Sequence, residues 1–165
     1  MFFLFSSNSQ TLTQTFNEPL IGDIDISYRI DTSNYLSGLP VTVTGSNCVW
    51  NFSNLKGAFP LVTDSFISPA GAPGTTMYPG ATYVQHRDVL YSYFRSTTSP
   101  AQTELLGGYS TTLSLTFTNS AIIASYPISY GYLQSDPVSG SFKYNTSTGA
   151  CNGSVTIAAD GIGTL

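Results

Sequence analysis

The amino-acid sequence predicts an all-β fold, an antiparallel β-sandwich of the immunoglobulin-like or jelly-roll-like type, and three observations lead to this prediction. Apolar and polar residues alternate with a period of two along much of the chain, as they do in strands that bury one face. Turn residues interrupt the alternation roughly every 8 to 12 residues, a spacing typical of two-sheet sandwiches. No amphipathic segment is long enough to be the helical crossover that a parallel sheet needs.

The alternation places the predicted strands along the chain. Five segments alternate clearly, namely 24–30, 41–44, 48–53, 113–118 and 154–157. Six weaker candidates are 12–16, 59–67, 91–95, 103–106, 122–129 and 141–144. Short segments rich in Gly, Ser, Asn and Asp favour turns between these strands. They are Ser37-Gly38, Gly45-Ser46-Asn47, Gly107-Gly108, Asn119-Ser120, Ser139-Gly140, Asn152-Gly153 and Asp160-Gly161.

Two adjoining segments in the middle of the chain break this rhythm. Residues 81–94 carry apolar side chains at helical spacing, but their end is rich in Tyr and Phe. Because aromatic residues favour strands, we predict a strand over 90–95. Residues 68–80 contain three prolines and three glycines. We expect this segment to be a surface loop that has little to bury and is the least ordered internal part of the chain.

Length and composition limit the class of protein. A chain of 165 residues with 41% hydrophobic residues is one globular domain rather than a disordered segment. Only 8% of the residues are charged, against about 25% in an average soluble domain. The five Lys and Arg residues are scattered singly, which argues against nucleic-acid binding, since that function needs clustered cations. No apolar run approaches the roughly 18 to 20 residues of a membrane span.

The two ends of the chain are typical of a piece of an exported protein. Residues 1–10 resemble the apolar end of a signal peptide whose basic start is missing, with an ordinary first strand as the alternative. We therefore expect 1–10 to be a signal-peptide remnant and 11–165 to be a single β-sandwich domain. Asp160-Gly161 is a hairpin cue with only 162–165 after it, so we expect the domain to be incomplete at the C-terminus, without its last strand or strands.

Cys48 and Cys151 are the only cysteines. In an exported protein, an even pair far apart in the sequence suggests one disulfide. Trp50, two residues after Cys48, would then pack over the buried bridge. Two separate buried thiols are the alternative.

Two segments near the C-terminus resemble a pattern in secreted and surface proteins of Bacteroidota. They are YPISYGYLQSDPVSGSF (126–142) and GSVTIAADGIGTL (153–165), and TLTQTFNEPLIGD (11–23) is similar to the start of the mature chains of those proteins. The resemblance implies a secreted or cell-surface location and export through the type IX secretion machinery. It implies no specific activity, and the C-terminal sorting domain that such proteins carry is not in this sequence.

No residue pattern in the chain predicts catalysis or a cofactor. His86 is the only histidine, and Asp88 follows two residues later, but no Gly-x-Ser-x-Gly motif accompanies them. We therefore interpret the pair as a polar surface cluster. One His and two distant Cys do not fill a zinc shell. Asp23 and Asp25 leave a weak calcium site open, with solvated carboxylates as the alternative.

The aromatic residues give the one positive indication of a ligand. Tyr78 and Tyr83 flank Pro79-Gly80 on the predicted loop, where exposed rings offer a platform for the apolar face of a sugar. The sequence thus predicts a non-catalytic extracellular structural or interaction domain with an unknown surface or glycan ligand. The alternative is a carbohydrate-binding module attached to a polysaccharide-degrading enzyme.

Overall fold

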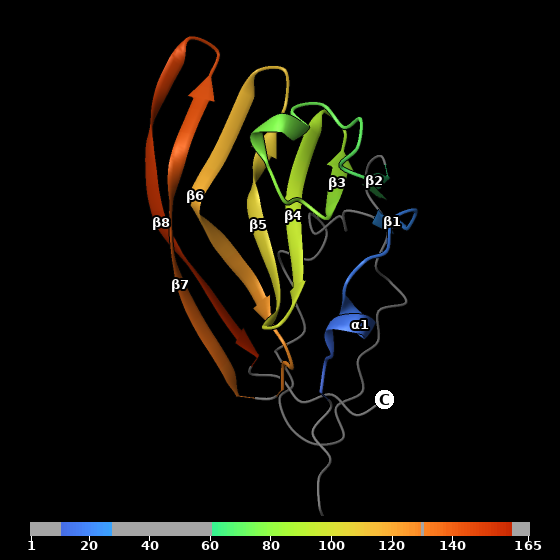
Figure 1. Cartoon of the computed structure of the whole chain (residues 1–165). Helices are drawn as coiled ribbons and strands as arrows, with labels where there is room; N and C mark the ends of the chain where they lie inside the picture. Colours follow the sequence, from blue (N-terminus) through green and yellow to red (C-terminus); the bar gives the residue numbers. More distant parts are fainter. Residues whose placement is uncertain (1–10, 28–60, 130, 160–165) are drawn as a thin grey trace, which may run out of the picture.

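A computed structural model of the chain describes residues 11–27, 61–129 and 131–159 (Figure 1). The predicted strands at 41–44 and 48–53, Cys48, the signal-peptide remnant and residues 160–165 lie outside the described residues. The described strands are β1 (Ile24–Ser27), β2 (Val62–Ile67), β3 (Tyr83–Arg87), β4 (Leu90–Thr98), β5 (Ala101–Tyr109), β6 (Leu113–Ser125), β7 (Tyr132–Tyr144) and β8 (Ser147–Ala159). A short helix α1 (Gln14–Asn17) and a 3-10 helix η1 (Thr75–Met77) accompany them.

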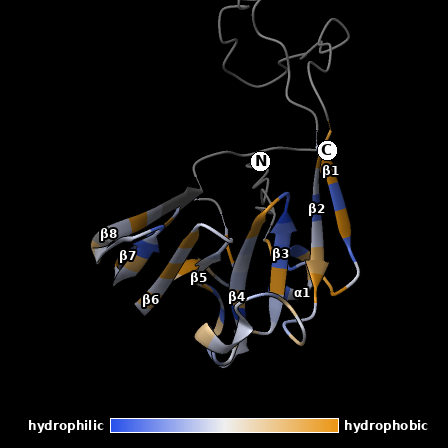
Figure 2. Cartoon of the chain, turned by 90° about the horizontal axis from the view of Figure 1, so that it is seen from above, coloured by the Kyte–Doolittle hydropathy of each residue, from blue (hydrophilic) through white to orange (hydrophobic). Residues whose placement is uncertain are grey.

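The eight strands form one antiparallel sheet in which each strand pairs with the next along the chain, from β1 to β8. Seen from above, the strands follow a curved line from β8 to β1 (Figure 2). The all-β antiparallel class is therefore confirmed. The second layer of the predicted sandwich is not among the residues described.

Register assigns the side chains of the central strands to two faces, because residues paired across neighbouring strands point the same way. Val84 pairs with Tyr93, and these two residues define what we call the loop face. Tyr83 pairs with Phe94 on the opposite side, which we call the N-terminal face.

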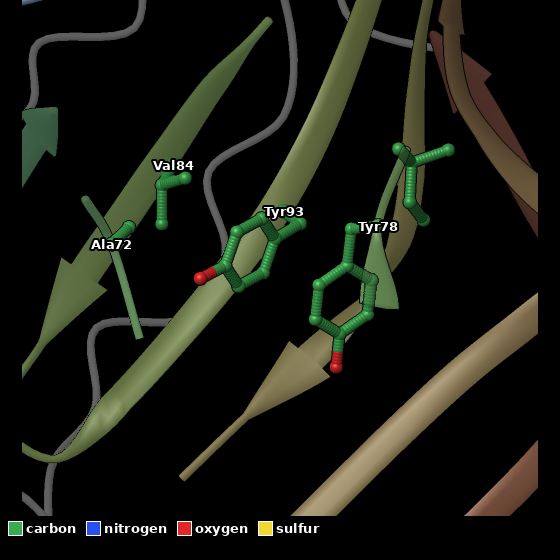
Figure 3. Packing of buried hydrophobic residues seen from close by; sticks show 5 residues of the cluster. Ala72, Tyr78, Val84 and Tyr93 are labelled. Carbon is green, nitrogen blue, oxygen red and sulfur yellow. The ribbon is translucent and has the colours of Figure 1, made fainter. Parts of the chain in front are cut away.

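The loop before β3 covers the loop face and forms the main core. Ala72 and Tyr78 of this loop pack with Val84, Tyr93 and Leu106. The rings of Tyr78 and Tyr93 stack with their centroids 4.1 Å apart (Figure 3). The expectation that residues 68–80 have little to bury is therefore wrong, because this loop supplies the most buried aromatic contact that the structure describes.

Residues 11–23, which we call the N-terminal segment, cross the opposite face. Leu12 and Ile128, which lies three residues after β6, donate backbone hydrogen bonds to each other's carbonyls. At the other end of the segment, the Gly22 amide donates to the Phe66 carbonyl of β2 at 2.7 Å. The predicted strand over 12–16 is wrong, since Gln14–Asn17 form a helical turn and only Leu12 pairs as a strand residue.

Four of the residue pairs that predict turns lie inside strands instead. Gly107-Gly108, Asn119-Ser120, Ser139-Gly140 and Asn152-Gly153 belong to β5, β6, β7 and β8. At Gly107 and Gly140 the neighbouring strand approaches so closely that an added Cβ would lie 1.9 and 2.2 Å from its carbonyl oxygens. These glycines therefore permit close backbone approach rather than a chain reversal. The predicted strand at 90–95 is confirmed within β4, and β1 and β2 confirm the described parts of 24–30 and 59–67.

Candidate functional site

An open groove of about 610 Å³ lies between the N-terminal segment and the sheet. Its lining comes from α1, the chain that follows it, β1 and strands β2 to β6, with Tyr126 just after β6. The lining residues are Phe16, Asn17, Glu18, Pro19, Asp23, Ile24, Asp25, Phe66, Tyr83, Gln85, Phe94, Thr103, Ile123, Ala124 and Tyr126.

Three aromatic side chains on the N-terminal face line this groove. Tyr83 and Phe94 stack with centroids 5.0 Å apart, and Phe66 meets Tyr83 edge-on at 6.2 Å. Tyr83 and Phe94 are both buried. Burial, with smaller contributions from the charges of Glu18 and Tyr126, raises the pKa of the Tyr83 phenol. The groove therefore rests on a packed, neutral aromatic layer.

The carboxylate of Glu18 anchors the N-terminal segment to the sheet. It accepts hydrogen bonds from the hydroxyls of Ser96, at 2.5 Å, and Thr103. Gln14, one turn earlier, donates to the Ser96 hydroxyl and to the Thr97 carbonyl, each at 2.9 Å. These contacts fix the position of α1 above the hairpin of β4 and β5.

Five large apolar side chains along residues 16–26 are exposed to solvent, and we call this set the apolar stretch. Their relative exposures run from 55% to 77%, and the residues are Phe16, Leu20, Ile21, Ile24 and Ile26. Figure 2 shows the hydrophobic colour of the isoleucines alternating with hydrophilic residues along β1. Exposed apolar residues gathered in one place mark interaction sites more often than scattered ones do.

The same part of the chain is acidic. Residues 11–27 contain Glu18, Asp23 and Asp25, and no Lys, Arg or His. Asp23 accepts a hydrogen bond from the Leu20 amide at 2.8 Å, which holds the turn before β1. Among the residues described, no three His, Cys, Asp or Glu side chains cluster as metal ligands. The calcium site near Asp23 and Asp25 therefore receives no support from this part of the structure.

The structure corrects the sequence-based expectation for the two tyrosines. Tyr78 is 2% exposed and Tyr83 is 7% exposed. They lie on opposite faces of the sheet, with Tyr78 in the core of the loop face and Tyr83 in the groove floor. The prediction that both rings are solvent-facing is wrong, because the loop folds back and packs Tyr78 on Tyr93 instead of displaying it. They form no exposed sugar platform.

The remaining residues that the sequence singled out are His86, Asp88 and Cys151. The His86 ring stacks on Tyr91 with centroids 4.3 Å apart, and its Nε2 lies 2.7 Å from the Asp88 carbonyl. Asp88 itself occupies the turn between β3 and β4 with a φ of 53°. Cys151 is half-buried in β8. Because Cys48 lies outside the described residues, the disulfide stays a prediction.

The apolar stretch was missed by sequence reasoning. The alternation predicts Ile24 and Ile26 on the buried face of a strand, but both are exposed, since alternation alone does not tell which face is covered. A signal was nevertheless present, because Leu20 and Ile21 stand between Pro19 and Gly22 in a turn-like context where apolar residues are uncommon.

The chain matches no family model, no curated protein and no solved structure. None of the helices in the described ranges has the length and apolar character required to cross a membrane.

Proposed function

We propose that this chain is a non-catalytic extracellular interaction domain of a surface-exported protein, and that a partner binds at the apolar stretch. The exposure of Phe16, Leu20, Ile21, Ile24 and Ile26 is the observation that carries the proposal. The charge-poor, hydroxyl-rich composition supports an extracellular setting. The resemblance to Bacteroidota proteins supports secretion or surface display through the type IX machinery. The proposal keeps the sandwich as the architecture of the whole domain, with the described sheet as one layer.

The chemistry of this surface favours a partner that is both apolar and basic. A partner that covers the five apolar side chains removes them from water. This burial stabilises the complex by about 1.5 to 3 kcal/mol for each fully buried side chain. Glu18, Asp23 and Asp25 stand between them, with no cation in residues 11–27. A binding segment that carries Lys or Arg among apolar residues is therefore attracted, whereas an acidic one is repelled.

The N-terminal segment is held firmly enough to present this surface. Its two ends form backbone hydrogen bonds with Ile128, just after β6, and with Phe66 of β2, and Glu18 joins its middle to β4 and β5. A binding surface that is already in place loses less conformational entropy when the partner docks.

Selection from a random peptide library displayed on phage tests this proposal. We expect peptides rich in apolar and basic residues to be enriched on the immobilised chain, and their affinity to fall as salt rises. The double variant Ile24→Ser/Ile26→Ser should weaken binding of a synthetic selected peptide by at least about tenfold, equivalent to about 1.4 kcal/mol.

The matched control changes exposed apolar residues elsewhere. Val89 lies in the turn between β3 and β4, and Leu133 lies in β7; both are exposed. The variant Val89→Ser/Leu133→Ser should bind as the wild type does. Equal loss in both variants, or no enrichment of basic apolar peptides, would contradict the proposal.

A carbohydrate-binding module is the second candidate, and the groove is the observation that favours it. The exposed Phe16 ring stands beside Asn17, Asp23 and Gln85, which together offer an apolar face and hydrogen-bonding groups. Affinity electrophoresis in gels containing xylan, laminarin or starch tests this candidate. Retardation that Phe16→Ala abolishes and Val89→Ala preserves would replace the peptide-binding proposal with this one.

A further inference from the structure

The groove between the N-terminal segment and the sheet carries negative charge and no positive charge. Glu18, Asp23 and Asp25 belong to its lining, and none of the lining residues is Lys, Arg or His. Arg87 pairs with Asp64, and Asp25 lies near enough to help raise the pKa of this guanidinium. Neither of the two ion pairs that the structure describes includes Glu18 or Asp23. These two carboxylates therefore have no cation partner among the residues described.

The half-buried carboxylate of Glu18 has room for one more donor. An ionised carboxylate offers about four acceptor positions. The Oε1 atom accepts from Gln14, at 3.1 Å, and from the Thr103 hydroxyl, and Oε2 accepts from the Ser96 hydroxyl at 2.5 Å. With the residues described, Oε2 thus keeps one position on a group that lines the groove. All three donors are neutral, whereas a charge withdrawn from water is favourable when an opposite charge pairs with it.

The phenol of Tyr83 is a second polar group that points to this groove. Burial is the main cause that raises its pKa, and the charges of Glu18 and Tyr126, both in the lining, contribute to the shift. No hydrogen bond from a described residue contributes to it. Although Tyr83 is 7% exposed, its hydroxyl still reaches the groove, because no fully buried side-chain polar atom of the described residues lacks a partner. An unpaired hydroxyl at this position favours a ligand that donates hydrogen bonds.

A guanidinium group matches these features better than an ammonium does. It is a planar cation with a rigid fork of N–H donors, so it can donate to two acceptors while it stacks on an aromatic ring. The exposed ring of Phe16 lies in the same lining and offers such a ring. An ammonium is a compact, strongly hydrated charge that does not stack in this way.

We propose that an arginine side chain of the partner enters this groove, stacks on Phe16, and donates to Glu18 and to the Tyr83 hydroxyl. The inference rests on the proposed function and names the residue through which the basic partner is recognised. The apolar residues of the same partner cover the apolar stretch, which adjoins the groove through Phe16 and Ile24.

Variants of a synthetic selected peptide test this inference. Each arginine is replaced in turn by lysine or by citrulline, a neutral side chain of similar shape, and fluorescence anisotropy gives the affinity for the whole chain. At one position we expect citrulline to weaken binding at least about tenfold, equivalent to about 1.4 kcal/mol, and lysine at least about threefold. Equal affinities of the three peptides, or selected peptides with lysine and no arginine, would overturn the inference. The proposed function would survive that result if binding still required Ile24 and Ile26.

Protein variants show whether the groove receives this arginine. In Glu18→Gln the citrulline replacement should cost less than about threefold, because the charge that pairs with arginine is gone. Tyr83→Phe leaves the contacts of Glu18 in place and should weaken binding of the arginine peptide at least about threefold. Asp88→Asn removes a carboxylate from the exposed turn between β3 and β4 and should bind as the wild type does. A full citrulline cost in Glu18→Gln, or unchanged affinity in Tyr83→Phe, would overturn the inference.

Agmatine, a small molecule with a guanidinium group, separates an arginine of the partner from a free ligand. It makes no contact with the apolar stretch, so we expect it to displace the peptide only at concentrations at least about a hundredfold above the Kd of the peptide. Displacement at concentrations similar to that Kd would assign the groove to a free guanidinium compound and overturn the partner's arginine.

Discussion

Tyr78 connects three parts of the structure through one side chain. Its ring stacks on Tyr93, and its phenol lies 2.6 Å from the Gly108 carbonyl and 3.1 Å from the Leu115 carbonyl. Burial is the main cause that raises the pKa of this phenol to about 12. The side chain is therefore a neutral hydrogen-bond donor across the whole physiological range.

Removal of the Tyr78 hydroxyl tests this role. Tyr78→Phe keeps the ring but leaves the two carbonyls without their donor, so we expect a loss of about 1 to 2 kcal/mol in the free energy of unfolding. Tyr144→Phe changes an exposed ring and should have no measurable effect. Urea titration of both variants gives the comparison. An unchanged free energy of unfolding in Tyr78→Phe would show that the Tyr78 hydroxyl does not contribute to stability.

A second prediction concerns Gly107 in β5. It has a φ of 149°, and an added Cβ would lie 1.9 Å from the Leu115 carbonyl oxygen and 2.7 Å from the Tyr78 ring. We expect Gly107→Ala to lower the free energy of unfolding by about 3 kcal/mol or more. Gly153→Ala in β8 meets nothing within 4 Å and should change stability by less than about 0.5 kcal/mol. Similar melting temperatures for the two variants would contradict the close approach of β6 to the backbone at Gly107.

Two ion pairs predict how stability depends on pH. Arg87 donates to Asp64 at 2.6 Å, and this hydrogen bond lowers the Asp64 pKa despite burial. Burial raises the Glu104 pKa, but the Ser120 hydroxyl and Arg95 outweigh it, so its pKa is also lowered. Both carboxylates therefore stabilise the fold above their ordinary pKa values of 3.8 for Asp64 and 4.5 for Glu104. That stability is lost as pH falls through the lower folded-state values.

Unfolding free energies measured by urea titration from neutral to acidic pH check this prediction. The wild type should lose stability progressively below about pH 4.5. In Asp64→Asn the acid-induced loss should be smaller, because one of the two linked protons no longer binds on unfolding. An unchanged pH dependence in that variant would exclude Asp64 as a contributor.

At the scale of elements, the N-terminal segment depends on a few polar contacts. Glu18→Ala leaves the hydroxyls of Ser96 and Thr103 without their acceptor, so we expect a loss of about 1 to 3 kcal/mol. Amide hydrogen exchange should become faster over residues 11–23 in this variant. Thr15→Ala, at an exposed position of the same segment, is the control and should exchange as the wild type does.

The elements also show where sequence patterns predict structure and where they do not. Alternation located β1 and β2, and the strand propensity of aromatic residues located the first part of β4. Alternation did not show what is buried, since all four residues of β1 are exposed. Turn prediction failed at Gly107 and Gly140, since the close approach of β6 that requires these glycines is a tertiary contact. The helical turn α1 was likewise missed, because long-range hydrogen bonds of Gln14 and Glu18 fix it.

At the scale of the whole molecule, the sequence predicted the antiparallel all-β class but not the arrangement of the described strands. A simple meander and a sandwich share the same alternation and turn spacing, so these patterns do not distinguish them. The candidate site was misplaced for a related reason. The sequence shows which residues are apolar or aromatic, but the loop that buries Tyr78 and the contacts that expose Ile24 become visible only in three dimensions.

Binding of a partner at the apolar stretch is tested by amide hydrogen exchange, measured with and without a selected basic apolar peptide. We expect slower amide exchange on binding in residues 16–27 and in β2, the strand that pairs with β1. We expect no change in β7 and β8. Slower exchange confined to other strands, or none in residues 16–27 at saturating peptide, would contradict the claim.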